Sequence, residues 1–201
     1  MKFIVGKKQN MTQIWNDKGE VVPVTVVIAT PNVVTQVKNN EVDGYEAVQV
    51  GFGARREKNV SQAVKGHTKK FGVFATLREF RVEKPTVAVG DTLSVATFAV
   101  GDMATVSSIS KGKGFQGVVK RHGFHGGPRS HGQKHSEREA GSVGGGLRNK
   151  VPKGMRMPGR MGADMITQKN LEIVAVDQEN NLVMIKGALP GRRGTVVAIE
   201  A

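Results

Sequence analysis

Apolar side chains recur at every second position over much of this chain, which is the spacing of β-strands. In 22–29 the intervening positions are also largely apolar, so a buried or barrel strand is expected there. Pro23 cannot donate a ladder hydrogen bond, which favours a sheet edge or the start of that strand. The pattern predicts strands over 3–6, 11–15, 22–29, 32–38, 47–52, 77–82, 92–100, 104–110, 171–176, 182–185 and 195–199.

Polar and glycine-rich stretches separate these strands and are predicted to be turns, at 16–19, 39–44, 87–91 and 177–181. A single short helix is predicted at 61–65, with Ser61 or Asn59 as its N-cap and Gly66 weakening its end. It belongs to a small elaboration, 53–75, whose several cations form either an ordinary solvated face or an RNA contact. Many short strands with little helix predict a mainly β fold, a barrel or a sandwich.

The positive charge of the chain is concentrated in one segment, which differs in composition from the predicted strands. The 201 residues carry 30 Lys or Arg and 17 Asp or Glu, a net charge of +13. The segment 111–162 alone holds 12 of the cations, only two acids (Glu137 and Glu139) and 14 glycines. With few large apolar residues, it cannot bury a core of its own. We predict an extended arm, 111–162, inserted into one globular β domain formed by 1–110 and 163–201.

A concentrated positive charge indicates a polyanionic partner, and nucleic acid is the expected one. Charge kept for solubility alone is usually dispersed and mixed in sign. The absence of Cys excludes disulfides and thiolate metal sites. The longest apolar-rich run, 21–29, is much shorter than the ~20 residues that cross a bilayer. We therefore expect a soluble intracellular protein with no membrane partner.

The run 112–117 satisfies G-x-G-x-x-G and suggests a dinucleotide site. Such a site needs a helix that opens at the third glycine, Gly117, but Gly123 interrupts any helix after five residues. The acid at the expected distance, Glu137, ends a polar stretch that cannot be a buried strand. The remaining interpretation is a contact surface. The glycines allow close approach of the backbone to another surface, and the lysines bind phosphate there.

Four histidines in the arm, His122, His125, His131 and His135, suggest a metal site. No Cys or well-placed carboxylate accompanies them, and cations lie among them, so no metal and no cofactor is expected. Imidazoles that stack on bases or donate to phosphate and 2′-hydroxyl groups are the favoured interpretation. Phe115 and Phe124 could stack on bases, although we expect Phe115 to pack the root of the arm against the barrel.

Several motifs, in order along the whole chain, resemble the bacterial ribosomal large-subunit protein L3 family. The N-terminal part contributes Gly-Lys-Lys at 6–8, Met-Thr-Gln-Ile at 11–14, Pro-Val-Thr-Val at 23–26, Val-Thr-Gln-Val-Lys at 34–38 and Asp-Gly-Tyr at 43–45. The arm contributes Ser-Lys-Gly-Lys-Gly-Phe at 110–115, Lys-Arg at 120–121, Ser-His-Gly at 130–132, Gly-Ser-Val-Gly at 141–144 and Gly-Arg-Met-Gly at 159–162. The tail contributes Asn-Leu-Val-Met-Ile-Lys-Gly-Ala-Leu-Pro-Gly at 181–191.

This resemblance implies a translation-factor-like β-barrel with a small α+β elaboration and a long irregular loop that binds rRNA. It also implies a structural protein without enzymatic activity, bound near the 3′ end of 23S rRNA, where it nucleates assembly of the large subunit. The loop would reach toward the peptidyl transferase region, and ribosomal proteins L14 and L19 would be neighbours. The tip, 144–150, lacks the glutamine-bearing stretch that many bacterial members methylate, so no modified glutamine is expected.

The predicted RNA-binding residues are the cations of the arm together with two of its histidines. They are Lys111, Lys113, Lys120, Arg121, Arg129, His131, Lys134, His135, Arg138, Arg148, Lys150, Lys153, Arg156 and Arg160. Two other functions are considered. A free nucleic-acid chaperone or DNA-compacting protein would bind any duplex with similar affinity, and a phosphate- or nucleotide-binding enzyme would use 112–117. No small-molecule substrate is expected.

Overall fold

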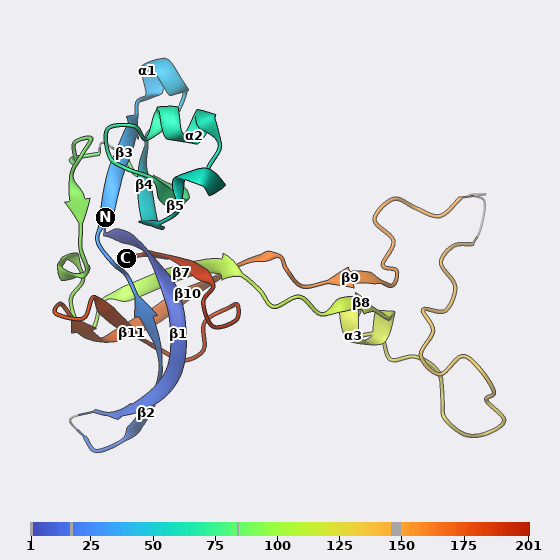
Figure 1. Cartoon of the computed structure of the whole chain (residues 1–201). Helices are drawn as coiled ribbons and strands as arrows, with labels where there is room; N and C mark the ends of the chain where they lie inside the picture. The colour runs from blue at the N-terminus through green and yellow to red at the C-terminus, as the bar shows by residue number, and fades with distance from the viewer. Residues whose placement is uncertain (1, 17, 84, 146–149) are drawn as a thin grey trace. The chain divides into compact units, whose positions relative to one another are not determined.

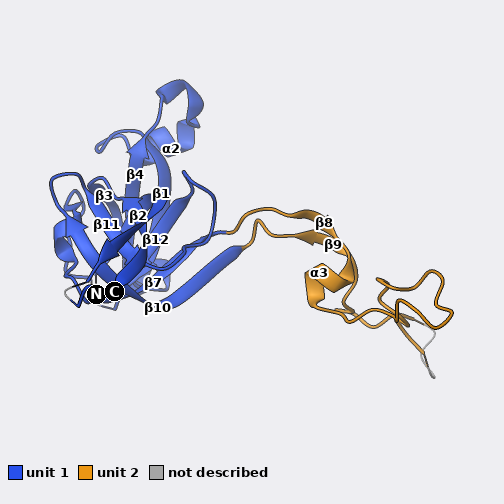
Figure 2. Ribbon diagram, turned by 90° about the horizontal axis from the view of Figure 1, so that it is seen from below, with its two compact units in different colours: residues 1–109, 165–201 blue, residues 110–164 orange. Residues whose placement is uncertain are grey.

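The computed structural model describes residues 2–16, 18–83, 85–145 and 150–201. Contacts divide the chain into two compact units, 1–109 with 165–201 and 110–164 (Figure 2). The second unit begins one residue before and ends two residues after the arm proposed from the sequence. The two units are called the barrel unit and the insertion below.

The core of the barrel unit is a closed antiparallel barrel of six strands, in the order β1-β12-β7-β10-β11-β2 (Figure 1). The mainly β prediction with a barrel is therefore confirmed. The strands are β1 (Phe3–Trp15), β2 (Val21–Ile28), β7 (Met103–Ile109), β10 (Met165–Asp177), β11 (Leu182–Lys186) and β12 (Val196–Glu200). The two chain ends meet beside the barrel, where the Lys2 N–H donates to the Ala201 carbonyl at 2.9 Å and the Ala201 N–H to the Lys2 carbonyl at 2.8 Å.

Two barrel strands are longer than their hydrophobic pattern predicts. β1 runs without a break through 3–15, and a register shift between Lys8 and Met11 accounts for the interruption of its pattern. β10 extends to 13 residues and shifts register between Gln168 and Leu171. A bulge reverses which face the apolar side chains occupy, so simple alternation stops there although the strand continues.

Aliphatic side chains fill the barrel, as the single Trp and single Tyr of the chain require. The interior includes Ile4, Val27, Ala104, Val106, Ile173, Val183, Ile185, Leu189, Val197 and Ile199. The predicted strand 92–100 is wrong beyond its first two residues, which form β6 (Thr92–Leu93). The chain then turns into a 3₁₀ helix, η2 (Val95–Thr97). This turn places Val95 and Phe98 in the barrel core, 1% and 5% exposed, which an extended strand would not achieve.

A second sheet with the strand order β5-β4-β3-β6 forms the elaboration of the barrel unit. Its other strands are β3 (Asn32–Lys38), β4 (Ala47–Ala54) and β5 (Phe74–Arg81), and its helices are α1 (Asn40–Asp43), η1 (Glu57–Asn59) and α2 (Gln62–His67). The stretch 39–44 is thus a single helical turn that ends at left-handed Gly44, not merely a polar turn. Phe3 and Phe80 stack in a separate core beneath this sheet, with ring centroids 4.8 Å apart.

The insertion leaves the barrel unit after β7 and returns at β10 in the sequence. It is less irregular than predicted, because it contains the strand pair β8 (Gly114–Gln116) and β9 (Gly159–Met161) and the helix α3 (Val118–His122). In the described residues, no helix is long and apolar enough to cross a membrane.

Candidate nucleic-acid interface

The two ends of the insertion form an antiparallel stem. Phe115 lies opposite Arg160 in the β8–β9 ladder, and the Lys113 N–H donates to the Met161 carbonyl at 2.9 Å. The Ser110 N–H donates to the Asp164 carbonyl at 2.9 Å, which extends the stem toward its base. The stem therefore fixes the backbone positions of the basic side chains on both of its strands.

Helix α3 packs against the irregular segment that leads into β9. The Arg121 guanidinium donates to the Met157 carbonyl at 2.6 Å, and His122 Nε2 lies 3.1 Å from the same oxygen. A Cβ on Gly159 would lie 2.7 Å from the Arg121 guanidinium, so the glycine gives that side chain its space. Arg121 is half-buried and supports the stem, a role that sequence did not predict.

The glycine run 112–117 does not build a dinucleotide site. Its helix, α3, has only five residues and ends at left-handed Gly123, and β8 pairs with an antiparallel strand. A dinucleotide site needs parallel strands joined by a crossover helix with its N-terminus at the pyrophosphate. Among the described residues, no group of three or more His, Asp or Glu could hold a metal.

The structure leaves most of the predicted RNA-binding side chains on the surface of the insertion. Those exposed are Lys111, Lys113, Lys120, Arg129, His131, Lys134, His135, Arg138, Lys150, Lys153, Arg156 and Arg160. Arg148 lies outside the described residues. In the described ranges, Arg129 is the only member of the set in an ion pair, at 2.5 Å from Glu137. Most of this positive charge is therefore not neutralised within the insertion.

Phe115 is placed differently from its prediction. It is 75% exposed on β8, so it does not pack as the apolar root of the arm. An exposed ring at this position, opposite Arg160 in the strand register, suits stacking on a base. Met155, Met157 and Met165 are also exposed in the described chain.

A second set of cations lies on the barrel unit, around η1 and α2. The range 55–70 carries six Lys or Arg and a single acid, Glu57. His67, at the end of α2, lies 2.6 Å from Gln49 Oε1, and Gln49 Nε2 donates to Glu79 at 3.0 Å. Burial would raise the pKa of Glu79, but hydrogen bonds from Gln49, Lys38 and Tyr45 outweigh it and lower that pKa. The ionised carboxylate thus anchors the network that holds the basic segment on its sheet.

A buried lysine on β1 was not predicted as a structural residue. Lys8 is 9% exposed, and its ammonium donates to the carbonyls of Leu189 and Gly191 at 2.7 and 3.2 Å. The Gly194 N–H donates to the Lys8 carbonyl at 2.8 Å. These bonds fold the basic loop 190–194 against β1. The only signal in the sequence was the motif at 6–8, which does not distinguish Lys7 from Lys8.

A closed antiparallel barrel with a strongly cationic insertion places this chain in the class of β-barrel proteins that carry a basic extension. The family model described as Ribosomal protein L3 matches residues 75–181. The large ribosomal subunit proteins uL3 of Bacillus mycoides (strain KBAB4) and Bacillus cereus (strain G9842) are each 46% identical to this chain over 202 aligned residues. Each alignment covers 99% of this chain and 96% of the relative. The chain belongs to the ribosomal protein L3 family, as its motifs indicated.

Proposed function

We propose that this member of the L3 family is a structural constituent of the large ribosomal subunit and binds 23S rRNA through its insertion. The observation that carries the proposal is the set of exposed cations on 110–164, of which only Arg129 is ion-paired in the described part of the chain. Names of the Bacillus relatives support the assignment to the large subunit and, with it, to the cytoplasm.

The chemistry of the insertion suits a crowded RNA interior. Arg presents a planar fork that meets phosphate in two hydrogen bonds, while Lys supplies a mobile point charge. Glycine-rich backbone without bulky side chains approaches the sugar-phosphate chain closely. Cations held on a stem and on irregular segments neutralise phosphates from several directions, which lets RNA helices pack together.

The finer expectations follow from family membership. The protein binds near the 3′ end of 23S rRNA, nucleates assembly, and directs the insertion toward the peptidyl transferase region. Neighbouring proteins are L14 and L19. Peptidyl transfer is carried out by RNA, so the protein is not an enzyme and takes no cofactor or small-molecule substrate.

Sedimentation tests this proposal directly. The protein is expected to co-sediment with large ribosomal subunits and to remain bound through a high-salt wash, because the contacts lie within folded rRNA. Excess unrelated duplex RNA is expected not to release it. Release by such duplex, or absence from large subunits, would favour a free nucleic-acid chaperone and contradict the proposal.

A further inference from the structure

The hairpin of β1 and β2 extends past the strands that flank it in the barrel (Figure 1). β12 pairs with β1 only as far as Lys7, and β11 pairs with β2 only from Val24 onward. In the described ranges, the strand pairing of 11–15 is with 21–25 of the hairpin itself. A two-stranded ribbon buries little apolar surface by itself. Apolar side chains on it are therefore exposed unless another molecule covers them.

One side of the hairpin continues the surface that lines the barrel interior. On β2, Thr25 is fully buried opposite Ile185 of the barrel core. Every second residue of a strand points to the same side, so the next two residues on this side are Pro23 and Val21. Both are exposed. The apolar pattern of a core strand thus runs on beyond the barrel.

β1 supplies the largest side chains of this surface. Directly opposite residues of an antiparallel pair share a side, and the register places Trp15 opposite Val21. Trp15 is 66% exposed, Val21 53% and Met11 46%. Trp15 is the only Trp of the chain, and Trp is among the residues most enriched at the energetic centres of protein interfaces. The surface is called the hairpin face below and consists of Met11, Gln13, Trp15, Val21 and Pro23.

The turn of the hairpin is held by Asn16, so the hairpin face is formed before any partner binds. Asn16 Oδ1 accepts hydrogen bonds from the N–H groups of Lys18 and Glu20 at 3.1 and 2.8 Å. The Asn16 N–H donates to the Glu20 carbonyl at 3.0 Å. A preorganised surface loses less conformational entropy on association. The exposed Trp15 therefore lies on an ordered ribbon and is suited to docking.

Charge distinguishes the hairpin from the RNA-binding insertion. The segment 9–23 carries one Lys and two acids, so its net charge is −1 within a chain of +13. The hairpin face itself holds no charged residue. RNA binding draws its free energy largely from cations on phosphate, which this surface does not supply. An apolar face with a slightly acidic border instead complements a basic protein that has an apolar contact surface.

We propose that the hairpin face docks a second, basic protein of the large ribosomal subunit and buries Trp15 in the contact. The inference rests on the proposed function, since assembly into the large subunit brings the partner to this chain. It goes beyond that function by assigning a protein-binding surface to a part of the barrel unit that does not bind RNA.

Photo-crosslinking in assembled subunits tests the proposal. The full-length chain with p-benzoylphenylalanine in place of Trp15 is assembled into large subunits, and the crosslinked products are identified by mass spectrometry. Crosslinks to a different, basic ribosomal protein are expected. The same replacement of Thr12, which is exposed on the opposite side of the hairpin, is the matched control and should give few.

Crosslinks from position 15 to rRNA or to a second copy of this chain would overturn the proposal, as would equal protein yields at the two positions. Failure of the wild-type chain to enter large subunits would instead contradict the proposed function itself.

Fluorescence of the single Trp gives a second measure. Binding of protein-free 23S rRNA is expected to leave the emission wavelength of Trp15 that of a solvent-exposed indole. Trp15→Ala should leave the affinity for this rRNA unchanged but weaken binding of the crosslinked partner roughly tenfold or more. Val42→Ala, which removes an 88% exposed side chain outside the hairpin, should change neither affinity. A blue shift with rRNA alone, or weakened rRNA binding by Trp15→Ala, would contradict the proposal.

Discussion

At the scale of single residues, Gly162 shows how one position determines the geometry of the stem. Its φ is +77°, in the left-handed region, and a Cβ there would lie 2.2 Å from the Lys111 carbonyl oxygen. Both the backbone conformation and the close approach of the two chains therefore require glycine. Sequence marked this residue only as part of a family motif, because the identity of the opposing atom depends on the fold.

Gly162→Ala is expected to open the base of the stem while leaving the barrel folded. Backbone strain of about 1–3 kcal/mol corresponds to roughly fivefold to 150-fold faster exchange of the Lys113 and Ser110 amides. Hydrogen exchange followed by NMR measures this. Gly117→Ala is the matched control, because a Cβ there meets nothing within 4 Å and the φ is not left-handed. Equal exchange rates in both variants would show that the close contact does not constrain the stem.

At the scale of elements, alternation located most strands but not their lengths or their ends. It failed at the bulges of β1 and β10, where the side-chain period is broken but hydrogen bonding continues. It also failed at η2, since Val95 and Phe98 are apolar like strand residues but enter the barrel core from a 3₁₀ turn. A short helix was predicted at 61–65, and α2 occupies Gln62–His67, so the helix continues through Gly66, which was expected to weaken its end.

One ion pair joins the start of β1 to the start of β7. The Lys2 ammonium donates to Asp102 Oδ2 at 2.6 Å, and the Ala99 N–H donates to the same oxygen at 2.8 Å. The hydrogen bond from Lys2, followed by that from Ala99, lowers the pKa of Asp102 below its ordinary value of 3.8. A lowered pKa in the folded state stabilises the fold above pH 3.8, and this contribution is lost as pH falls through the lowered value.

Asp102→Asn is therefore expected to lower the melting temperature of the protein at pH 7. The difference from wild type should begin to shrink as the pH falls below 3.8 and should vanish below the lowered pKa of Asp102, where the carboxylate of the folded wild type also becomes protonated. Thermal melts followed by circular dichroism at several pH values measure this. Lys2→Met should behave similarly, whereas Lys18→Met at an exposed turn should not. A difference from wild type that is independent of pH would rule out the carboxylate charge as the cause.

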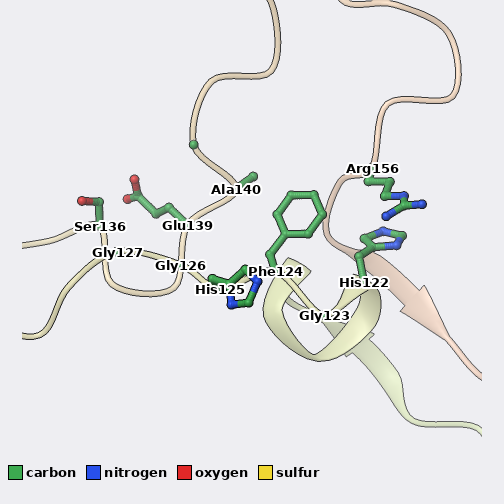
Figure 3. A pocket seen from close by; sticks show the side chains of 11 residues that line it. His122, Gly123, Phe124, His125, Gly126, Gly127, Ser136, Glu139, Ala140 and Arg156 are labelled. Atoms are coloured by element: carbon green, nitrogen blue, oxygen red, sulfur yellow. The ribbon is translucent and has the colours of Figure 1, made fainter.

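At the scale of the whole molecule, the distribution of charge along the sequence indicated a function, which the hydrophobic pattern did not. The concentration of cations in 111–162 indicated an RNA-binding unit without any knowledge of the fold. The sequence could not reveal that Arg121 binds a carbonyl in its own unit, that Arg129 is paired, or that Phe124 and Glu139 line the same hollow of the insertion (Figure 3). These relations depend on the stem and on the loop closed at Gly127 and Glu137, which bring residues distant in sequence together.

The dependence of rRNA affinity on salt tests most directly whether the insertion carries the binding. If roughly 6–10 phosphates are contacted, the logarithm of the association constant falls against the logarithm of salt concentration with a slope of about −4 to −9. Replacing Lys111, Lys113, Lys153 and Arg156 with Gln should reduce the magnitude of that slope by about 3. Replacing the exposed Lys18, Lys169, Arg192 and Arg193 of the barrel unit with Gln removes the same charge and should change the slope much less. A wild-type slope near −1, or equal losses in the two variants, would contradict the account.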